Sequence, residues 1–178
     1  KYLMKILYLI AHHDDEFGAW PLINQRAANN DYQCFVYLSD SGQLNEQGRR
    51  IQESRSFLSK WENHDVNLLG LNFEFRDGDL ISNLHECYYE LVTFIKQYGP
   101  FDSTITHAYE GGHPDHDACF MLVGALIEGN HLPDNAIQFS LYHTHQRRFP
   151  FICGAAPLIS NGPFIHLDKP MTFWNWIQ

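Results

Sequence analysis

Apolar and polar residues alternate along most of the chain in two kinds of block, which predict strands and helices in turn. Runs rich in apolar residues predict strands, and the first run is apolar at nearly every position, as in a strand buried on both faces of a parallel sheet. Between the runs, apolar residues recur three or four positions apart, which is typical of helices with one buried face. The predicted strands span residues 3–10, 33–38, 65–69, 103–108 and 136–142, and the predicted helices span residues 16–29, 49–61, 80–98 and 118–126.

This alternation, with short connections, predicts an α/β layered fold with a mainly parallel sheet of about five or more strands. After residue 142 the periodicity fails, and proline interrupts the sequence at Pro150, Pro163 and Pro170. The 178 residues are enough to bury about 70% of the unfolded surface in one domain. We therefore predict a single domain over residues 1–178, with a core at 1–142 and an irregular tail at 143–178.

Charge and cysteine usage limit the classes of partner and the cellular compartment that we expect for the protein. The formal net charge is −9 and no run of Lys or Arg exceeds two residues, which argues against nucleic acid or an anionic membrane as the main partner. The run at residues 3–10 is expected to be a core strand and not a signal peptide, and no transmembrane segment is predicted. The cysteines are far apart, so buried free thiols and a reducing, cytoplasmic compartment are expected. They are Cys34, Cys87, Cys119 and Cys153.

Two polar clusters each follow a predicted strand. The first is Ala-His-His-Asp-Asp-Glu at residues 11–16, and the second is His-Pro-Asp-His at residues 113–116. Open α/β sheets bind ligands beyond the carboxyl ends of their strands. We therefore expect the two clusters to meet at one edge of the sheet, although about a hundred residues separate them.

Together the clusters offer a set of nitrogen and oxygen ligands for a metal ion. His12 and Asp15, spaced i, i+3, can point to one side of a loop that turns into a helix, and the second cluster adds His113 and His116. Two histidines and one carboxylate suit zinc and leave a coordination position for water, which is the mark of a catalytic site. The sequence has no G-x-G-x-x-G motif, Walker loop or G-x-S-x-G elbow, so nucleotide-cofactor and serine-hydrolase chemistry find no support.

The remaining side chains of the clusters have predicted roles beside the metal. With Asp15 on the metal, Asp14 can take the proton of a water whose pKa zinc lowers to about 7. If His116 is the ligand, His113 would stabilise the tetrahedral intermediate or protonate the leaving amine. Asp115 could orient a histidine through its second ring nitrogen. The sequence predicts less specific roles for two neighbouring residues. Glu16 is expected to begin the next helix, and His107 is either a support for the site or a core histidine.

The clusters resemble the motifs of one family. Residues 11–16 are similar to the Ala-His-Pro-Asp-Asp-Glu motif of the PIG-L (LmbE-like) N-deacetylases, and residues 112–116 resemble that family's His-Pro-Asp-His motif. Between them, Arg-Ile-Gln-Glu at 50–53 resembles its Arg-x-x-Glu helix, and Asp-Gly-Asp-Leu at 77–80 resembles its Asp-Gly-x-Leu segment. All four occur in family order, within roughly residues 4–142.

The resemblance implies a Rossmann-like, three-layer enzyme that removes the N-acetyl group from an amino sugar or its glycoside, such as an N-acetylglucosamine conjugate. It implies that Zn2+, or another divalent metal, is bound by His12, Asp15 and His116. Asp14 would then be the general base, and His113 would stabilise the oxyanion.

The resemblance also implies that Arg50 and Asp77 face the sugar hydroxyls. An ion pair on a helix surface is the alternative for Arg50, and a turn-forming role is the alternative for Asp77. His13 stands where the family has proline; we expect it to point away from the metal, and an exchange with His12 as ligand is the alternative. Tyr109 is the nearest equivalent of a family tyrosine before the second motif, and the family's C-terminal histidine motif is not found.

Two other functions stay open. The same ligands could support metal-dependent hydrolysis of another amide or an ester. Alternatively, the protein could be a sugar-binding relative that has lost activity, although the retained Asp14 counts against this reading. The aromatic tail could pack on its own domain or on a second copy of the chain, so a homo-oligomer is possible.

Overall fold

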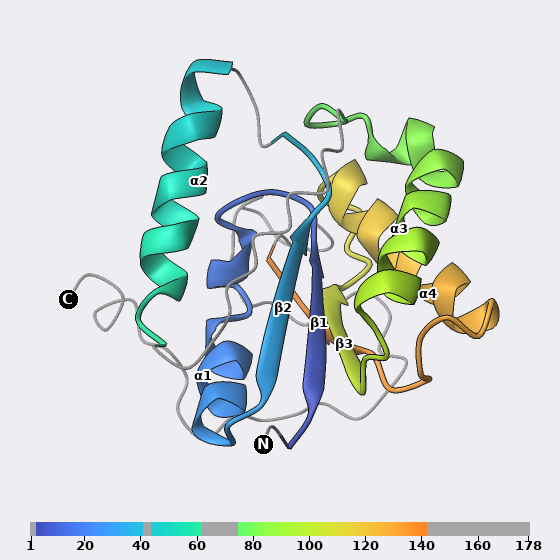
Figure 1. Ribbon diagram of the computed structural model, residues 1–178. Coiled ribbons are helices and arrows are strands. Elements are labelled where there is room, and N and C mark those ends of the chain that lie inside the picture. The colour runs from blue at the N-terminus through green and yellow to red at the C-terminus, as the bar shows by residue number, and fades with distance from the viewer. Residues whose placement is uncertain (1–2, 41–43, 62–74, 142–178) are drawn as a thin grey trace.

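A four-stranded parallel sheet forms the centre of the computed structural model (Figure 1). The structure describes residues 3–40, 44–61 and 75–141. All three strand pairings are parallel, in the order β2-β1-β3-β4. The strands are β1 (Lys5–Ile10), β2 (Tyr32–Tyr37), β3 (Ser103–His107) and β4 (Ile137–Phe139). Because β1 and β3 are adjacent and parallel, the polar clusters that follow them emerge at the same edge of the sheet.

Helices cover both faces of this sheet and make three layers. One face carries α1 (Trp20–Ala28) and α2 (Leu44–Leu58), and the other carries α3 (Leu84–Tyr98) and α4 (Pro114–Glu128) (Figure 1). Short 3-10 turns, η1 (Asp15–Phe17) and η2 (Leu80–Asn83), precede α1 and α3. The α/β prediction with helices on a parallel sheet is confirmed.

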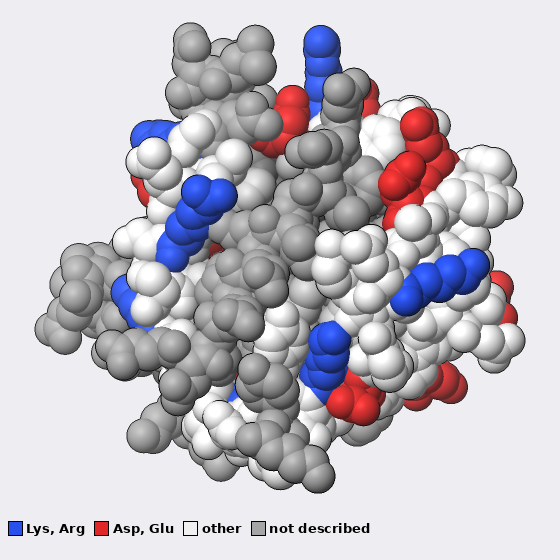
Figure 2. Space-filling model, in the orientation of Figure 1, with Lys and Arg blue, Asp and Glu red and all other residues white. Residues whose placement is uncertain are grey.

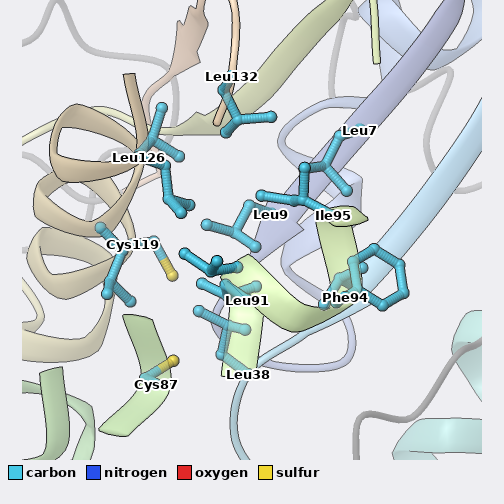
Figure 3. Packing of buried hydrophobic residues seen from close by; sticks show 14 of the residues in the cluster. Leu7, Leu9, Leu38, Cys87, Leu91, Phe94, Ile95, Cys119, Leu126 and Leu132 are labelled. Atoms are coloured by element: carbon cyan, nitrogen blue, oxygen red, sulfur yellow. The ribbon is translucent and has the colours of Figure 1, made fainter. Parts of the chain in front are cut away.

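Side chains of β1 alternate between two hydrophobic core clusters, one on each face of the sheet. Leu7 and Leu9 pack with residues of α3 and α4 (Figure 3), whereas Ile6, Tyr8 and Ile10 pack with residues of α1 and with the C-terminal end of α2. All five side chains are fully buried. A strand covered on both faces must be apolar at successive positions, which explains the continuous apolar run in the sequence.

Several predicted element bounds need correction. The described residues form a sheet of four strands where five or more were predicted. The predicted strand at 65–69 and the tail at 143–178 lie outside the described residues. The predicted helix at 16–29 is split into η1 and α1, and Pro21 lies in the first turn of α1, where its missing N–H costs nothing. Helix α2 begins at Leu44, before the predicted residue 49, and Gly48 lies inside it.

Cysteine burial agrees with the sequence, and charge is dispersed. Cys34, Cys87 and Cys119 are buried free thiols, as predicted, and Cys153 lies outside the described residues. No helix in the described part of the chain is both long and apolar enough to span a membrane. On the face shown in Figure 2, the Lys and Arg side chains lie apart from one another.

Candidate metal centre

The two polar clusters meet beyond the carboxyl ends of β1 and β3, around one carboxylate oxygen. Asp15 Oδ2 accepts the His12 main-chain N–H at 2.9 Å and lies 3.1 Å from His12 Nδ1. From the first turn of α4, His116 Nε2 lies 3.3 Å from the same oxygen. His12, Asp15 and His116 are each at most 5% exposed. The structure therefore brings together the three residues that the sequence and the resemblance suggested as ligands.

Two of the donor spacings and the chemistry of the donors suit a divalent metal ion. Ligand atoms about 2.0–2.2 Å from a tetrahedral metal lie roughly 3.3–3.5 Å from one another. The distances from Asp15 Oδ2 to the His12 and His116 nitrogens, 3.1 Å and 3.3 Å, are close to that spacing. A buried carboxylate also requires a positively charged partner. Two imidazoles and one carboxylate are a donor set that suits zinc.

Hydrogen bonds distinguish these three residues from their neighbours. Three groups of described residues have ligand atoms that all lie within 4.8 Å of one another: His12, His113 and His116; His12, Asp77, His113 and Asp115; and Asp15, His107 and His116. His12, Asp15 and His116 do not form such a group as a set, and Asp15 is the residue that lies close to both histidines. The Asp115 N–H donates to His113 Nδ1 at 3.2 Å, so the neutral ring carries its proton on Nε2. The Ala11 N–H donates to His107 Nε2 at 3.2 Å and occupies its lone pair. Neither Nε2 atom has a free lone pair for a metal in this arrangement.

Asp115 is fully buried and orients His12. Its Oδ2 lies 3.0 Å from His12 Nε2 and accepts the Gly78 N–H at 2.6 Å, while its Oδ1 accepts the Leu80 N–H at 3.1 Å. The sequence predicted that Asp115 would orient a histidine, and the structure places it on His12. A carboxylate behind a metal-binding histidine fixes the ring and raises its basicity.

The charges of the site depend on one another. Burial acts to lower the pKa of His12, but hydrogen bonds with Asp115 and Asp15 outweigh it and raise that pKa to about 10. Burial acts to raise the pKa of Asp15, but the three surrounding histidines, His107, His116 and His12, hold that pKa well below its usual value. His12 and Asp15 thus carry opposite charges, and a metal ion bound here would displace the proton of His12.

Asp14 is the more exposed of the two adjacent carboxylates. Arg50 donates to both of its oxygens, from Nη2 to Oδ2 at 2.7 Å and to Oδ1 at 2.9 Å, and from Nε to Oδ2 at 3.0 Å. Burial raises the pKa of Asp14, and Arg50 opposes that rise. The helix-surface ion pair considered for Arg50 is made instead by its neighbour Arg49 with Glu53, at 2.9 Å.

Asp77 lies on the open side of the cluster. Its Oδ1 is 3.2 Å from His12 Nε2 and 3.4 Å from His113 Nε2, and its side chain is 38% exposed. This position leaves Asp77 accessible to a ligand that reaches the site. Tyr109 is also partly exposed and has its ring 5.8 Å from that of Phe120.

The neighbours of the predicted ligands have roles that sequence reasoning left open or missed. His13 stacks on Tyr37, with ring centroids 4.1 Å apart, and belongs to none of the ligand groups of the described residues. Glu16, expected to begin a helix, is instead fully buried in η1 and accepts the Asp14 N–H at 2.8 Å. Burial raises the pKa of Glu16 to about 7. Ser54, which the sequence did not single out, accepts the same N–H through its hydroxyl at 3.1 Å.

His107, left undecided between a core residue and a support for the site, lies at the site. It is 1% exposed, and its ring stacks on that of His116 with centroids 4.0 Å apart. Burial lowers the pKa of His107 to about 4, so its ring is neutral. The signal for its place was its position at the end of β3, the strand that pairs with β1.

Comparison with known families identifies the chain. The family described as PIG-L: GlcNAc-PI de-N-acetylase matches residues 7–127. The chain belongs to the PIG-L family. The match includes both polar clusters and the Arg50 and Asp77 segments. No curated protein matches the chain.

Solved structures share the fold of this PIG-L domain at low sequence identity. A deacetylase of the A40926 pseudoaglycone has a TM-score of 0.59 at 16% identity, with 77% of this chain and 63% of that chain covered. A conserved protein from Thermus thermophilus has a TM-score of 0.58 at 18% identity, with 84% and 69% covered. The zinc-inhibited form of a teicoplanin deacetylase has a TM-score of 0.51 at 15% identity, with 76% and 67% covered. The chain thus spans less than two thirds of the A40926 deacetylase.

Proposed function

We propose that the protein is a zinc-dependent hydrolase that removes the N-acetyl group from an amino sugar or an amino-sugar conjugate. The observation that carries the proposal is the convergence of His12 and His116 on Asp15, with a second carboxylate, Asp14, directly beside them. Membership of a family described as GlcNAc-PI de-N-acetylase supports the reaction. Solved structures named as deacetylases share the fold.

In this proposal, His12, Asp15 and His116 hold the zinc ion, which when bound polarises the acetamide carbonyl and makes water more acidic. Asp14 is the general base that takes the proton of the attacking water. Its side chain is 39% exposed, so water can reach it, and Arg50 holds both of its oxygens in one orientation.

His113 is proposed to stabilise the oxyanion of the tetrahedral intermediate. Its Nδ1 accepts the Asp115 N–H, so Nε2 carries a proton and can donate it toward the open side of the site. A doubly protonated His113 ring would place its Nδ1–H against the Asp115 N–H. This disfavours the alternative in which His113 protonates the leaving amine. Asp14 can then return the proton it took from water to the leaving amine, and the products are acetate and a free amine.

Asp77 is proposed to contact the sugar, since its carboxylate faces the accessible side of the site. Arg50 is proposed to contact the same substrate while its Nε and Nη2 atoms stay bonded to Asp14. The substrate class, a small N-acetylated sugar or glycoside, rests on the family and not on a contact in the structure. A cytoplasmic location and a homo-oligomer stay predictions.

The test is acetate release from a panel of N-acetyl sugars, measured together with zinc content. Asp14→Asn should keep the metal and lower turnover by about 10²–10⁴-fold, because general-base catalysis is worth about that much. His116→Ala should lose the metal first. Arg49→Ala, which removes only the exposed ion pair with Glu53, is the control and should keep both. Full turnover in Asp14→Asn would refute the mechanism, and a protein that binds zinc but releases no acetate would refute the reaction.

A further inference from the structure

His107 contacts three separate parts of the candidate centre from the end of β3. Its Nε2 accepts the Ala11 N–H at 3.2 Å, at the point where β1 leads into His12. The same nitrogen lies 3.4 Å from Asp15 Oδ2. Its ring is stacked on the ring of His116, with centroids 4.0 Å apart and planes 10° apart. Phe139 of β4 packs near the His107 ring, with centroids 4.7 Å apart, so His107 has little freedom to move.

We propose that His107 is a positioning residue that holds Asp15 and His116 in the arrangement that binds the metal. The inference deepens the proposed function and rests on it only in taking these two residues as ligands. A metal site binds tightly when its ligands are held in place before the ion arrives. The bond to Ala11 fixes the backbone before the first cluster, and the stack fixes the plane of the His116 ring. His107 thereby couples the end of β1 to the start of α4.

The geometry gives His107 this role and not that of a ligand. Its Nε2 faces the site but accepts a backbone N–H, and breaking that bond would leave the buried Ala11 donor unpaired. An unpaired buried donor costs about 1–3 kcal/mol. The position of His107 behind Asp15 and His116 matches that of the outer residues that support metal ligands in other sites, whose loss weakens binding by about 10–100-fold.

The experiment compares two substitutions that separate the hydrogen bond from the stack. His107→Phe keeps a ring against His116 but has no acceptor for the Ala11 N–H. His107→Gln brings an amide oxygen close to the position of Nε2 and can restore that bond. Zinc affinity is measured on the full chain by competition with a chromophoric chelator, and the visible absorption of the Co2+-loaded protein reports the geometry of the ligands.

We expect His107→Phe to bind zinc about 10–100-fold more weakly and to shift the Co2+ spectrum. His107→Gln should recover most of the affinity and the native spectrum. Phe94→Leu is the matched control, because Phe94 is equally buried, at 1% exposure, but lies in α3 and packs against Tyr98 and Phe101 away from the site. It should lower the stability to unfolding without changing zinc affinity.

Three results would overturn the inference. Native affinity in His107→Phe would show that the hydrogen bond to the Ala11 N–H does not matter, and binding in His107→Gln as weak as in His107→Phe would show that an acceptor for this N–H does not restore the site. Loss of stoichiometric metal in both variants, as in His116→Ala, would make His107 a ligand. A wild-type chain that binds no zinc would overturn the proposed function as well, whereas zinc binding without deacetylation would overturn the proposed reaction alone.

Discussion

At the scale of single residues, neighbouring side chains at residues 12–16 have very different surroundings. Glu16 is fully buried and Asp15 nearly so, whereas the side chain of Asp14 is 39% exposed. Asp14 has φ at 91°, in the left-handed region that non-glycine residues rarely adopt. Because the backbone turns there, adjacent carboxylates can face different partners, Arg50 for Asp14 and the histidines for Asp15.

His13 provides a residue-scale prediction, because it stacks on Tyr37 and takes no part in the ligand groups of the described residues. His13→Phe keeps an aromatic ring on Tyr37 and should therefore retain the full zinc content, measured by elemental analysis after dialysis. His12→Phe is the matched comparison and should lose zinc. Loss of zinc in His13→Phe, with zinc kept in His12→Phe, would show that the two histidines exchange roles.

At the scale of elements, the loop between β3 and α4 is held by the helix that follows it. Asp117, in the first turn of α4, accepts the N–H groups of Glu110 and Gly111 at 2.9 Å and 3.1 Å. The Glu110 carboxylate in turn accepts the Leu141 N–H at 2.7 Å. A carboxylate near the N-terminus of a helix is also favoured by the helix dipole. These bonds fix the loop that leads to His113 and to the first turn of α4, which carries His116.

Asp117→Ala should lower the free energy of unfolding by about 1–3 kcal/mol, because it removes the carboxylate that accepts the N–H groups of the buried Glu110 and of Gly111. Chemical denaturation measures the change. Glu128→Ala, an exposed acidic residue at the other end of α4, is the control and should have little effect. Equal stability of the two variants would mean that the loop is held by other contacts.

At the scale of the whole molecule, the candidate centre joins the segment that follows β1 to helix α4. His12 and Asp15 follow the central strand, whereas His116 belongs to the α4 layer on one face of the sheet. Asp115 adds bonds to the backbone at residues 78–80 from the same region. An ion held by these residues would cross-link segments that are about a hundred residues apart in sequence.

Zinc should therefore stabilise the folded chain. At a free concentration 100 times its dissociation constant, a ligand specific for the folded state adds about 2.7 kcal/mol. For a chain of this size that corresponds to a rise in Tm of about 5–10 °C. Thermal unfolding after chelator treatment, with and without added Zn2+, measures the rise. His116→Ala should show no rise, and a similar rise in that variant would place the ion elsewhere.

Much of this arrangement could be predicted because it depends on local patterns. The apolar run at residues 3–10 identified a strand buried on both faces, since such a strand has no polar side. The position of the two clusters after β1 and β3 predicted that they would meet, because parallel strands end at one edge. The strand at 65–69 was inferred from local pattern in the same way, but it lies outside the described residues.

The sequence by itself determined the α/β class, the buried strand at the centre and the residue types that gather around Asp15. Only the tertiary structure decided which partner each of these side chains faces. It placed His107 against His116, Arg50 on Asp14 and Asp115 behind His12. These choices depend on the pairing of β1 with β3 and on the backbone turn at Asp14, and contacts between residues far apart in sequence leave no periodic signal along the chain.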